Sequence, residues 1–155
     1  CRALLIHLRE PKRALERMVA ALRPGGWLLV EEPDIGSAGA ANPDHPQASW
    51  FDRVRADAYE TMCRLSRLDF TFGRRCPRLL EDVGLLDVAS ETTSWVCRGG
   101  DMGAKFEQMN LELMSGFWRA ASLRDDDHDA LSRLYDDPSF AFFHWAMVGA
   151  WGRRP

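Results

Sequence analysis

The sequence feature that most constrains the fold is the turn Pro24-Gly25-Gly26, which separates two segments of different periodicity. Before the turn, apolar side chains recur every three or four residues between Pro11 and Leu22, the spacing of an amphipathic helix. After the turn, Trp27–Val30 is apolar without alternation, which indicates a short strand buried on both faces. Helix, tight turn and buried strand form half of a βαβ unit, so the chain predicts an α/β fold.

The rest of the chain continues this mixture of helices and strands. Phe140–Trp151 is apolar or small on both faces and predicts a central strand, whereas Asp87–Cys97 has the polar content of an edge strand. Helices are predicted at about 47–68, at Pro77–Val83, from the capping residue Asp101 through Phe117, and from the acidic run Asp125–Asp129. Five side chains of helix 47–68 are expected to face inward: Phe51, Val54, Ala58, Met62 and Leu65.

Composition excludes several classes of protein. The chain has 155 residues, the length of one domain, and its formal charge of −3 argues against a nucleic-acid partner. No apolar run approaches the roughly 18 residues of a membrane helix. Its four cysteines contain no C-x-x-C pair, which favours reduced thiols in a cytoplasmic protein over a disulfide framework or a metal site.

Four segments resemble class I S-adenosylmethionine-dependent methyltransferases, in the order in which that family has them. CRALLIHLREPKRAL resembles the segment after the fourth strand, often arginine and then L-x-x-H-L-x-D-P, although Glu10 replaces the usual aspartate. ALRPGGWLLVEEPD resembles the P-G-G junction that leads into the fifth strand and ends in acid. PRLLEDVGLLDV resembles the region of the sixth strand, and MVGAWGRRP resembles the closing seventh strand of a small-molecule subgroup.

The resemblance implies a Rossmann-like sheet in the order 3-2-1-4-5-7-6, with the seventh strand antiparallel. Residues 1–155 would be a single partial domain: a three-stranded half-sheet in the order 5-7-6, with Phe140–Trp151 in the middle, plus helical inserts at 40–75 and 101–138. The N-terminal cofactor-binding strands and their glycine-rich loop are missing, and Gly36 and Gly39 do not replace the loop because they follow the wrong strand. The implied activity is methyl transfer from S-adenosylmethionine to a small molecule, with this fragment alone inactive and without measurable affinity for the cofactor.

The resemblance also suggests residues for a cofactor site and a catalytic base. Cys1, Arg2 and Ala3 would lie just past the fourth strand, where the family's backbone contacts the amino acid part of the cofactor. His7 would lie in the first turn after that strand, and an imidazole that titrates near neutrality suits the deprotonation of a phenol or alcohol. A purely structural role stays open for all four residues.

A substrate site is expected where the buried strand Trp27–Val30 ends. In open α/β sheets, ligands bind outside the carboxyl ends of the strands, so Glu32 or Asp34 could orient a substrate hydroxyl or amine or accept its proton. The alternative is a solvated strand end. His144 is expected to be a satisfied core histidine, and aromatic and methionine residues of the inserts could be core or substrate lid: Trp50, Phe51, Met62, Phe106, Met109, Met114, Phe117 and Trp118.

Two other interpretations remain open. The chain could be a non-enzymatic interaction or structural module that kept the half-sheet and lost cofactor binding. It could also be an unrelated α/β domain that shares the P-G-G turn by coincidence, in which case Phe140–Trp151 would not lie between the other two strands. Without a fourth strand beside it, the outer edge of Trp27–Val30 would be unpaired, and such an edge promotes self-association.

Overall fold

The computed structural model describes residues 1–120 and 124–155, and these residues form two compact units. Unit 1 comprises Cys1–Ile35, Asp69–Thr93 and Ala146–Pro155, and unit 2 comprises Gly36–Leu68 and Ser94–Trp145. Both units are mixed α/β, and each contains one three-stranded antiparallel sheet. That the whole chain is one partial domain stays a prediction from the sequence.

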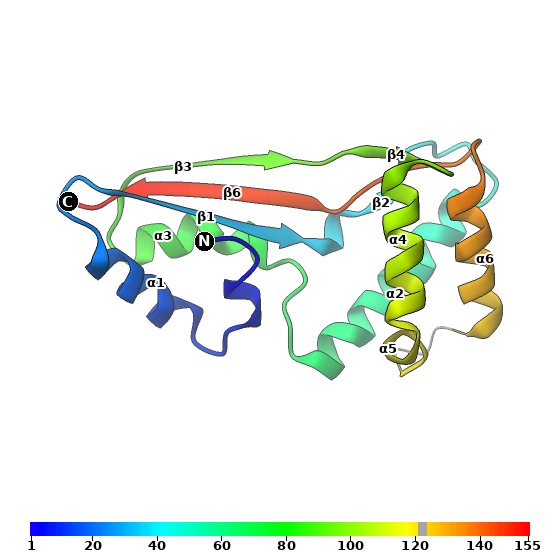
Figure 1. The fold of residues 1–155 in the computed structure, drawn as a ribbon, viewed down its shortest axis with the longest axis horizontal. Helices are drawn as coiled ribbons and strands as arrows, with labels where there is room; N and C mark the ends of the chain where they lie inside the picture. The colour runs from blue at the N-terminus through cyan, green and yellow to red at the C-terminus, as the bar shows by residue number, and fades with distance from the viewer. Residues whose placement is uncertain (121–123) are drawn as a thin grey trace. The chain divides into compact units, whose positions relative to one another are not determined.

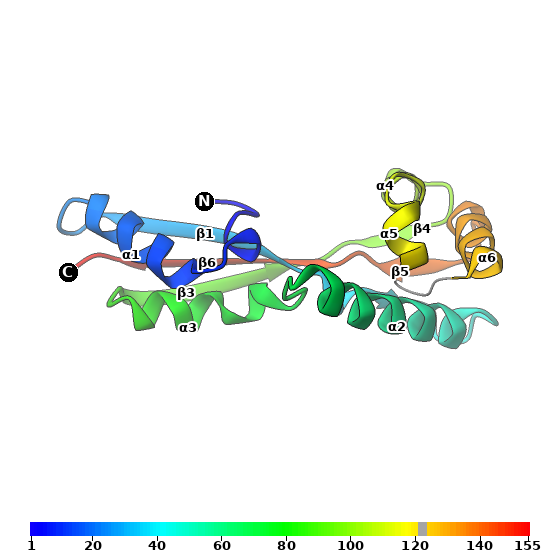
Figure 2. The same cartoon turned by 90° about the horizontal axis from the view of Figure 1, so that it is seen from below.

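Unit 1 is built on the sheet β1-β6-β3 (Figures 1 and 2). Its strands are β1 (Trp27–Asp34), β3 (Leu86–Thr93) and β6 (Ala146–Arg153). β6 lies in the middle and runs antiparallel to both neighbours. Of the predicted strand Phe140–Trp151, the part in β6 thus lies between β1 and β3, and the assignment of these strands to the order 5-7-6 stays a prediction.

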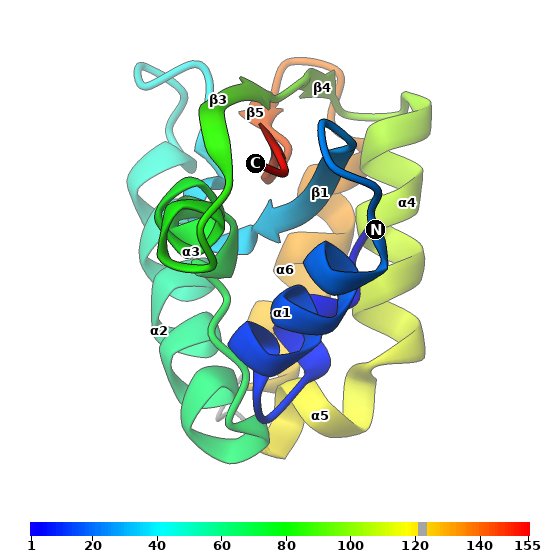
Figure 3. The same cartoon turned by 90° about the vertical axis from the view of Figure 1, so that its left-hand side faces the viewer.

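Helices cover one face of this sheet. They are η1 (Leu5–His7), α1 (Pro11–Ala21), η3 (Phe72–Arg75) and α3 (Cys76–Asp82). α1 begins at Pro11, whose missing N–H is not needed in the first turn, and buries Leu15 completely. α1 and α3 lie on the same side of the strands (Figures 1 and 3), so the opposite face of the sheet has no described helix over it.

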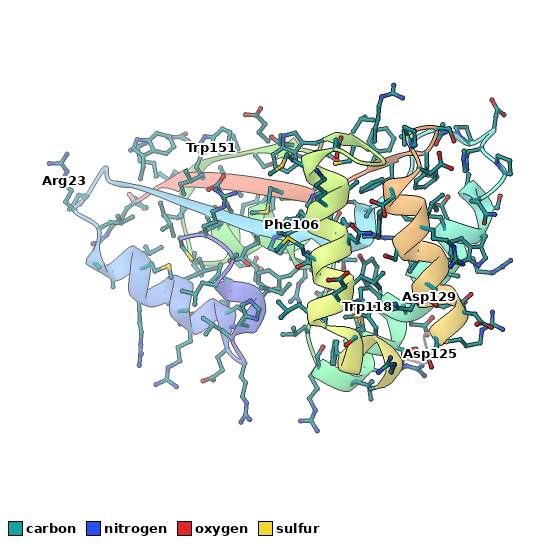
Figure 4. The ribbon with its side chains drawn as sticks, turned by 45° about the vertical axis from the view of Figure 1, so that its right-hand side comes forward. Arg23, Phe106, Trp118, Asp125, Asp129 and Trp151 are labelled. Atoms are coloured by element: carbon teal, nitrogen blue, oxygen red, sulfur yellow. The ribbon has the colours of Figure 1, made fainter. Side chains whose placement is uncertain are left out.

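The expectation that Trp27–Val30 is buried on both faces is wrong. Leu28 and Val30 are buried under the helices, but Trp27 and Leu29 are 53% and 50% exposed. The cause is the one-sided helix layer, because side chains of a strand alternate between the two faces. Trp151 is the cross-strand partner of Leu29, and Figure 4 places it on the side of the sheet away from α1.

The expectation of a fully unpaired outer edge of β1 is also wrong in part. Arg2 and Glu31 form a parallel bridge, and the amide of Ala3 donates to the carbonyl of Glu31 at 2.8 Å. The amide of Glu31 donates to the carbonyl of Cys1 at 2.9 Å, and the terminal ammonium of Cys1 donates to the carbonyl of Leu29 at 3.0 Å. Cys1–Ala3 therefore occupies the edge beside Leu29–Glu31 and leaves the part near Trp27 without a neighbour among the described residues.

Unit 2 combines a small sheet with four helices. The sheet order is β2-β5-β4, with β2 (Gly39–Ala40), β4 (Val96–Arg98) and β5 (Ala141–Phe143). The helices are α2 (Ala48–Ser66), α4 (Met102–Leu113), α5 (Ser115–Ala120) and α6 (Asp125–Asp136), and a short η2 (Ile35–Ser37) precedes β2. No described helix is long and apolar enough to cross a lipid bilayer.

Two predicted strands are each divided between the sheets. Asp87–Cys97 becomes β3 and β4, and Phe140–Trp151 becomes β5 and β6, so the chain forms two small sheets and not the one that was expected. Hydrogen bonds join the two segments where each predicted strand is interrupted. The Ser94 hydroxyl donates to the carbonyl of His144 at 2.6 Å, and the amide of His144 donates to the carbonyl of Trp95 at 2.8 Å.

In unit 2, the predicted first residues of the helices match the structure better than the predicted last residues do. Asp101 caps α4 as predicted, since its carboxylate accepts from the amide of Ala104 at 2.8 Å. α4 ends at Leu113, before Phe117, and α5 follows as a separate helix. In α2 the predicted inward residue Leu65 is 54% exposed.

We propose that isolated chains self-associate through the exposed side of β1. In light scattering, the unsubstituted chain should therefore form species larger than a monomer. The double substitution Trp27→Lys and Leu29→Lys should abolish these species, because lysines on an edge strand block pairing with a second strand. Both side chains are half exposed, so unit 1 should still fold, which circular dichroism checks. A monodisperse monomer of the unsubstituted chain would contradict the proposal.

Candidate functional site

The carboxyl end of β1 carries a buried carboxylate that holds the N-terminal segment of the chain. Glu32 is 0% exposed, although it lies in the acidic strand end that the sequence suggested as solvated or ligand-facing. Its Oε1 accepts from the amides of Leu4 at 2.9 Å and Leu5 at 2.7 Å, and its Oε2 accepts from the amide of Ile6 at 3.2 Å. Glu32 therefore binds the start of η1 in the way that an anion binds a helix N-terminus.

The substrate-binding role of Glu32 stays a prediction. Both of its oxygens accept hydrogen bonds from backbone amides inside unit 1. Its effect on a ligand would be indirect, through the segment that it holds. The same bonds occupy the amide groups at the start of η1, which are thereby unavailable to an anionic ligand.

His7 is the last residue of η1 and is exposed. The turn that carries it is fixed by Glu32 from below, because Leu5 and Ile6 are buried and their amides are bound. His7 directly follows the residues whose amides Glu32 binds, and its catalytic role stays a prediction.

Asp34, the last residue of β1, is 6% exposed and forms an ion pair with Arg74 of η3. The distance from Asp34 Oδ2 to Arg74 Nε is 2.7 Å, and this hydrogen bond raises the pKa of the Arg74 guanidinium. Arg74 itself is more than half exposed. The pair places a partly exposed guanidinium at this strand end, and the sequence did not indicate Arg74.

The predicted cofactor-contacting residues lie along the edge of β1. Cys1 and Arg2 are exposed, and the guanidinium of Arg2 lies 4.0 Å from the carboxylate of Glu31. Ala3 has a φ of 46°, a left-handed conformation that an L-residue adopts rarely. The structure therefore brings Cys1–Ala3, η1 and the end of β1 together within unit 1.

A second polar cluster is buried in unit 2, and the sequence analysis missed most of it. Arg55 of α2 is 3% exposed, and its Nη1 lies 3.4 Å from Glu107 Oε2 of α4 and 2.6 Å from the Tyr135 hydroxyl. His144 Nε2 lies 3.1 Å from Glu107 Oε1, so Glu107 joins two buried basic groups. The Arg55 guanidinium also donates to the Tyr59 hydroxyl. The prediction of a satisfied core histidine at position 144 is confirmed.

Burial and charge oppose each other in this cluster. Burial alone would raise the pKa of Glu107, but Arg55 and His144 more than offset it, and the pKa lies below its usual value. Burial also raises the pKa of Tyr135 to about 12, although Arg55 acts in the other direction. At neutral pH the cluster therefore contains a carboxylate, a guanidinium and uncharged phenols.

The positions of Arg55 and Glu107 follow from helical phase. Arg55 is four residues after the buried Phe51 and three before the buried Ala58. Glu107 lies between Ala104 and Leu111, both of which are buried. A charged residue in phase with apolar neighbours was the available signal, since a charge on such a face needs a buried partner.

An apolar groove of about 600 Å³ opens beside this cluster in unit 2. Its lining includes Trp95, Phe106, His144 and Trp145. The aromatic and methionine residues of the inserts lie partly in the core and partly on the surface. Phe51, Met62 and Trp118 are buried, whereas Phe106, Met109 and Met114 are exposed. Among the described residues, no group of three or more histidine, cysteine or acidic side chains is placed to hold a metal ion.

Comparisons with known proteins give similar folds at low similarity. No family model matches the sequence, and no curated protein matches it. Among solved structures, phosphoethanolamine N-methyltransferase 2 of Haemonchus contortus, in complex with phosphomonomethylethanolamine and S-adenosylhomocysteine, is similar over 99% of this chain at 12% identity and a TM-score of 0.46. The same enzyme in complex with S-adenosyl-L-methionine gives 14% identity and a TM-score of 0.42.

A protein of Bacillus halodurans assigned as a methyltransferase is similar over the whole chain, at 14% identity and a TM-score of 0.47. The present chain covers 32% of the Haemonchus enzyme and 68% of the Bacillus protein. Similarity at this level does not bear on what the chain binds.

Replacing Glu32 with glutamine should lower the free energy of unfolding of unit 1 by roughly 2 kcal/mol, because the amide nitrogen would face backbone N–H donors. The neighbouring Glu31→Gln is the matched control, since Glu31 is partly exposed and its ion pair with Arg2 is long. It should change stability by less than about 0.5 kcal/mol. Urea unfolding measures both, and equal effects would contradict the assigned role of Glu32.

Glu107 should make unit 2 sensitive to acid. Because its pKa is lower in the folded state, its contribution to stability is complete above the unfolded value of 4.5 and is lost as the pH falls through the folded pKa. Glu107→Gln should therefore cost about 3 kcal/mol near neutral pH and progressively less below pH 4.5. Urea unfolding from neutral to acidic pH, with Glu60→Gln on the exposed face of α2 as control, tests this; a difference independent of pH would contradict it.

Proposed function

We propose that this chain is the C-terminal part of an S-adenosylmethionine-dependent methyltransferase that acts on a small molecule in the cytoplasm. The observation that carries the proposal is the position of Cys1–Ala3, which pairs in parallel with β1 on the edge away from β6. The spatial order is then Cys1–Ala3, β1, β6, β3, with β6 antiparallel. This supports the correspondence to the fourth, fifth, seventh and sixth strands that the sequence motifs imply.

The geometry of the turn Pro24-Gly25-Gly26 explains why it contains two glycines, and it also supports the proposal. Gly25 has a φ of 75°, which favours glycine, and a Cβ on Gly26 would lie 2.8 Å from the carbonyl oxygen of Arg23. The amide of Gly25 donates to the carbonyl of Arg154, and the amide of Arg154 donates to the carbonyl of Gly26. The turn thus joins the start of β1 to the end of β6, and both motifs belong to one structural feature.

The described residues do not form a complete cofactor site. The amides at the start of η1 are bound to Glu32, and the sequence contains no glycine-rich loop after a first strand. S-adenosylmethionine, when bound, would supply an electrophilic methyl group. The residues that this chain would contribute are His7 as an exposed proton acceptor and Asp34, held by Arg74, as a polar contact for the substrate.

A non-enzymatic interaction module is the second candidate. The observation that favours it is the amount of exposed apolar surface, with Trp27, Leu29, Trp95 and Val96 all half exposed or more. Patches of this kind mark interaction sites. In this alternative the half-sheet is retained for binding and the methyl-transfer chemistry is absent.

Calorimetry with S-adenosylmethionine separates these candidates. We expect no micromolar binding to the 155 residues alone, and binding to the product of the reading frame extended upstream. In that longer protein, His7→Gln should reduce formation of S-adenosylhomocysteine while cofactor affinity is unchanged, and His128→Gln on α6 is the control. Absence of cofactor binding by the longer protein would contradict the enzyme proposal, and micromolar binding by the 155 residues would contradict the missing cofactor half.

A further inference from the structure

The helix α4 has apolar side chains on two opposite faces. Its inner face buries Ala104 and Leu111. Its outer face exposes four large apolar side chains: Met102 at 82%, Phe106 at 45%, Met109 at 67% and Leu113 at 85%. Figure 4 shows α4 with Phe106 labelled. A helix that is apolar on two faces usually has a partner on each. Within the described part of unit 2, Phe106 contacts the ring of His144, whereas Met102, Met109 and Leu113 are mostly exposed.

The spacing of the outer face is that of a helix–helix seam. Met102, Phe106, Met109 and Leu113 are separated by four, three and four residues, which is the alternation of a and d positions in a heptad. A stripe this regular places all four side chains on one line along the helix. It fits another straight helix better than it fits a sheet or a compact small molecule.

The charges beside the stripe define which helix fits. Lys105 and Glu112 are exposed and lie on the same flank, one near each end of α4, at the positions that precede Phe106 and Leu113. The other flank carries Gly103 and Asn110, which have no charge. In a parallel pair of identical helices the charged flank would meet the uncharged flank, and no ion pair would form. In an antiparallel pair the charged flanks meet, and each lysine lies near a glutamate of the other helix.

We propose that the outer face of α4 packs against the same face of a second copy of this chain, in antiparallel orientation. Met102 of one copy contacts Leu113 of the other, and Phe106 contacts Met109 of the other. Two symmetric ion pairs between Lys105 and Glu112 flank this seam. Because the contact is two-fold symmetric, it closes as a dimer and does not extend into a fibre.

The groove beside α4 enlarges the contact. Met102 and Phe106 line it together with Trp95, Val96 and Trp145, so the apolar surface continues from the seam onto β4 and the segment before β6. Two helices of 12 residues alone bury less than the roughly 1,200 Å² of a stable interface. The dimer is therefore concentration-dependent, and side chains of the groove contribute to it.

Charge exchange tests both the partner and the orientation. The variants are made with Trp27→Lys and Leu29→Lys, so that association through β1 does not contribute, and are compared by sedimentation velocity at low salt. Lys105→Glu should raise the dimer dissociation constant about tenfold, because two attractive contacts become repulsive. The double exchange Lys105→Glu with Glu112→Lys should restore the original value within about threefold.

An apolar variant completes the test. Met109→Gln with Leu113→Gln should leave a monomer at every concentration, and its circular dichroism should be unchanged because both side chains are already exposed. Failure of the double exchange to restore association would overturn the antiparallel pairing. If the protein that carries only Trp27→Lys and Leu29→Lys is a monomer, the proposed dimer is wrong. The outer face of α4 would then bind another helix or an apolar ligand.

Discussion

The carboxylate of Glu32 accepts hydrogen bonds from three successive amides, and the arrangement of the N-terminal segment depends on these bonds. Removing a carboxylate from water costs several kcal/mol unless it is paired or hydrogen-bonded. Here the cost is offset by the N–H groups of a turn whose own donors would otherwise be unsatisfied. One carboxylate therefore accepts from the N–H groups at the start of η1 and fixes this turn to β1. The preceding Cys1–Ala3 pairs with β1 through its own backbone hydrogen bonds.

Unit 2 satisfies its buried charges in a different way. Glu107 lies between Arg55 and His144, and the partners come from α2, α4 and the segment between β5 and β6. Breaking such a pair leaves an uncompensated buried charge, so the cluster fixes the mutual position of these three elements. In the same part of unit 2, the Ser94 hydroxyl donates to the carbonyl of His144, and the amide of His144 donates to the carbonyl of Trp95.

Local patterns predicted the elements whose causes are local. The P-G-G turn, the start of α1 at Pro11 and the cap at Asp101 each depend on residues within a few positions of one another, and all are present. The middle position of β6 followed from its apolar content and from the order of motifs that resemble methyltransferases. The burial of β1 was mispredicted, because periodicity does not reveal that helices cover one face only.

The sequence indicated where the candidate site lies, but it did not indicate what each of its residues contacts. The strand end at Asp34 and the turn at His7 were indicated by position, whereas the engagement of Glu32 depends on amides 26 to 28 residues away in the chain. No local pattern encodes such a contact. Arg74 was missed for the same reason, since its partner Asp34 lies 40 residues away.

Amide hydrogen exchange of the unmodified protein measures how firmly Glu32 holds the turn Leu4–Ile6 against β1. Leu4 is 44% exposed, so solvent accessibility alone would leave its amide fast to exchange. Because Glu32 binds them, we expect the amides of Leu4, Leu5 and Ile6 to exchange roughly a hundredfold more slowly than those of an unstructured peptide. Exchange at the unstructured rate for Leu4 and Leu5 would contradict it.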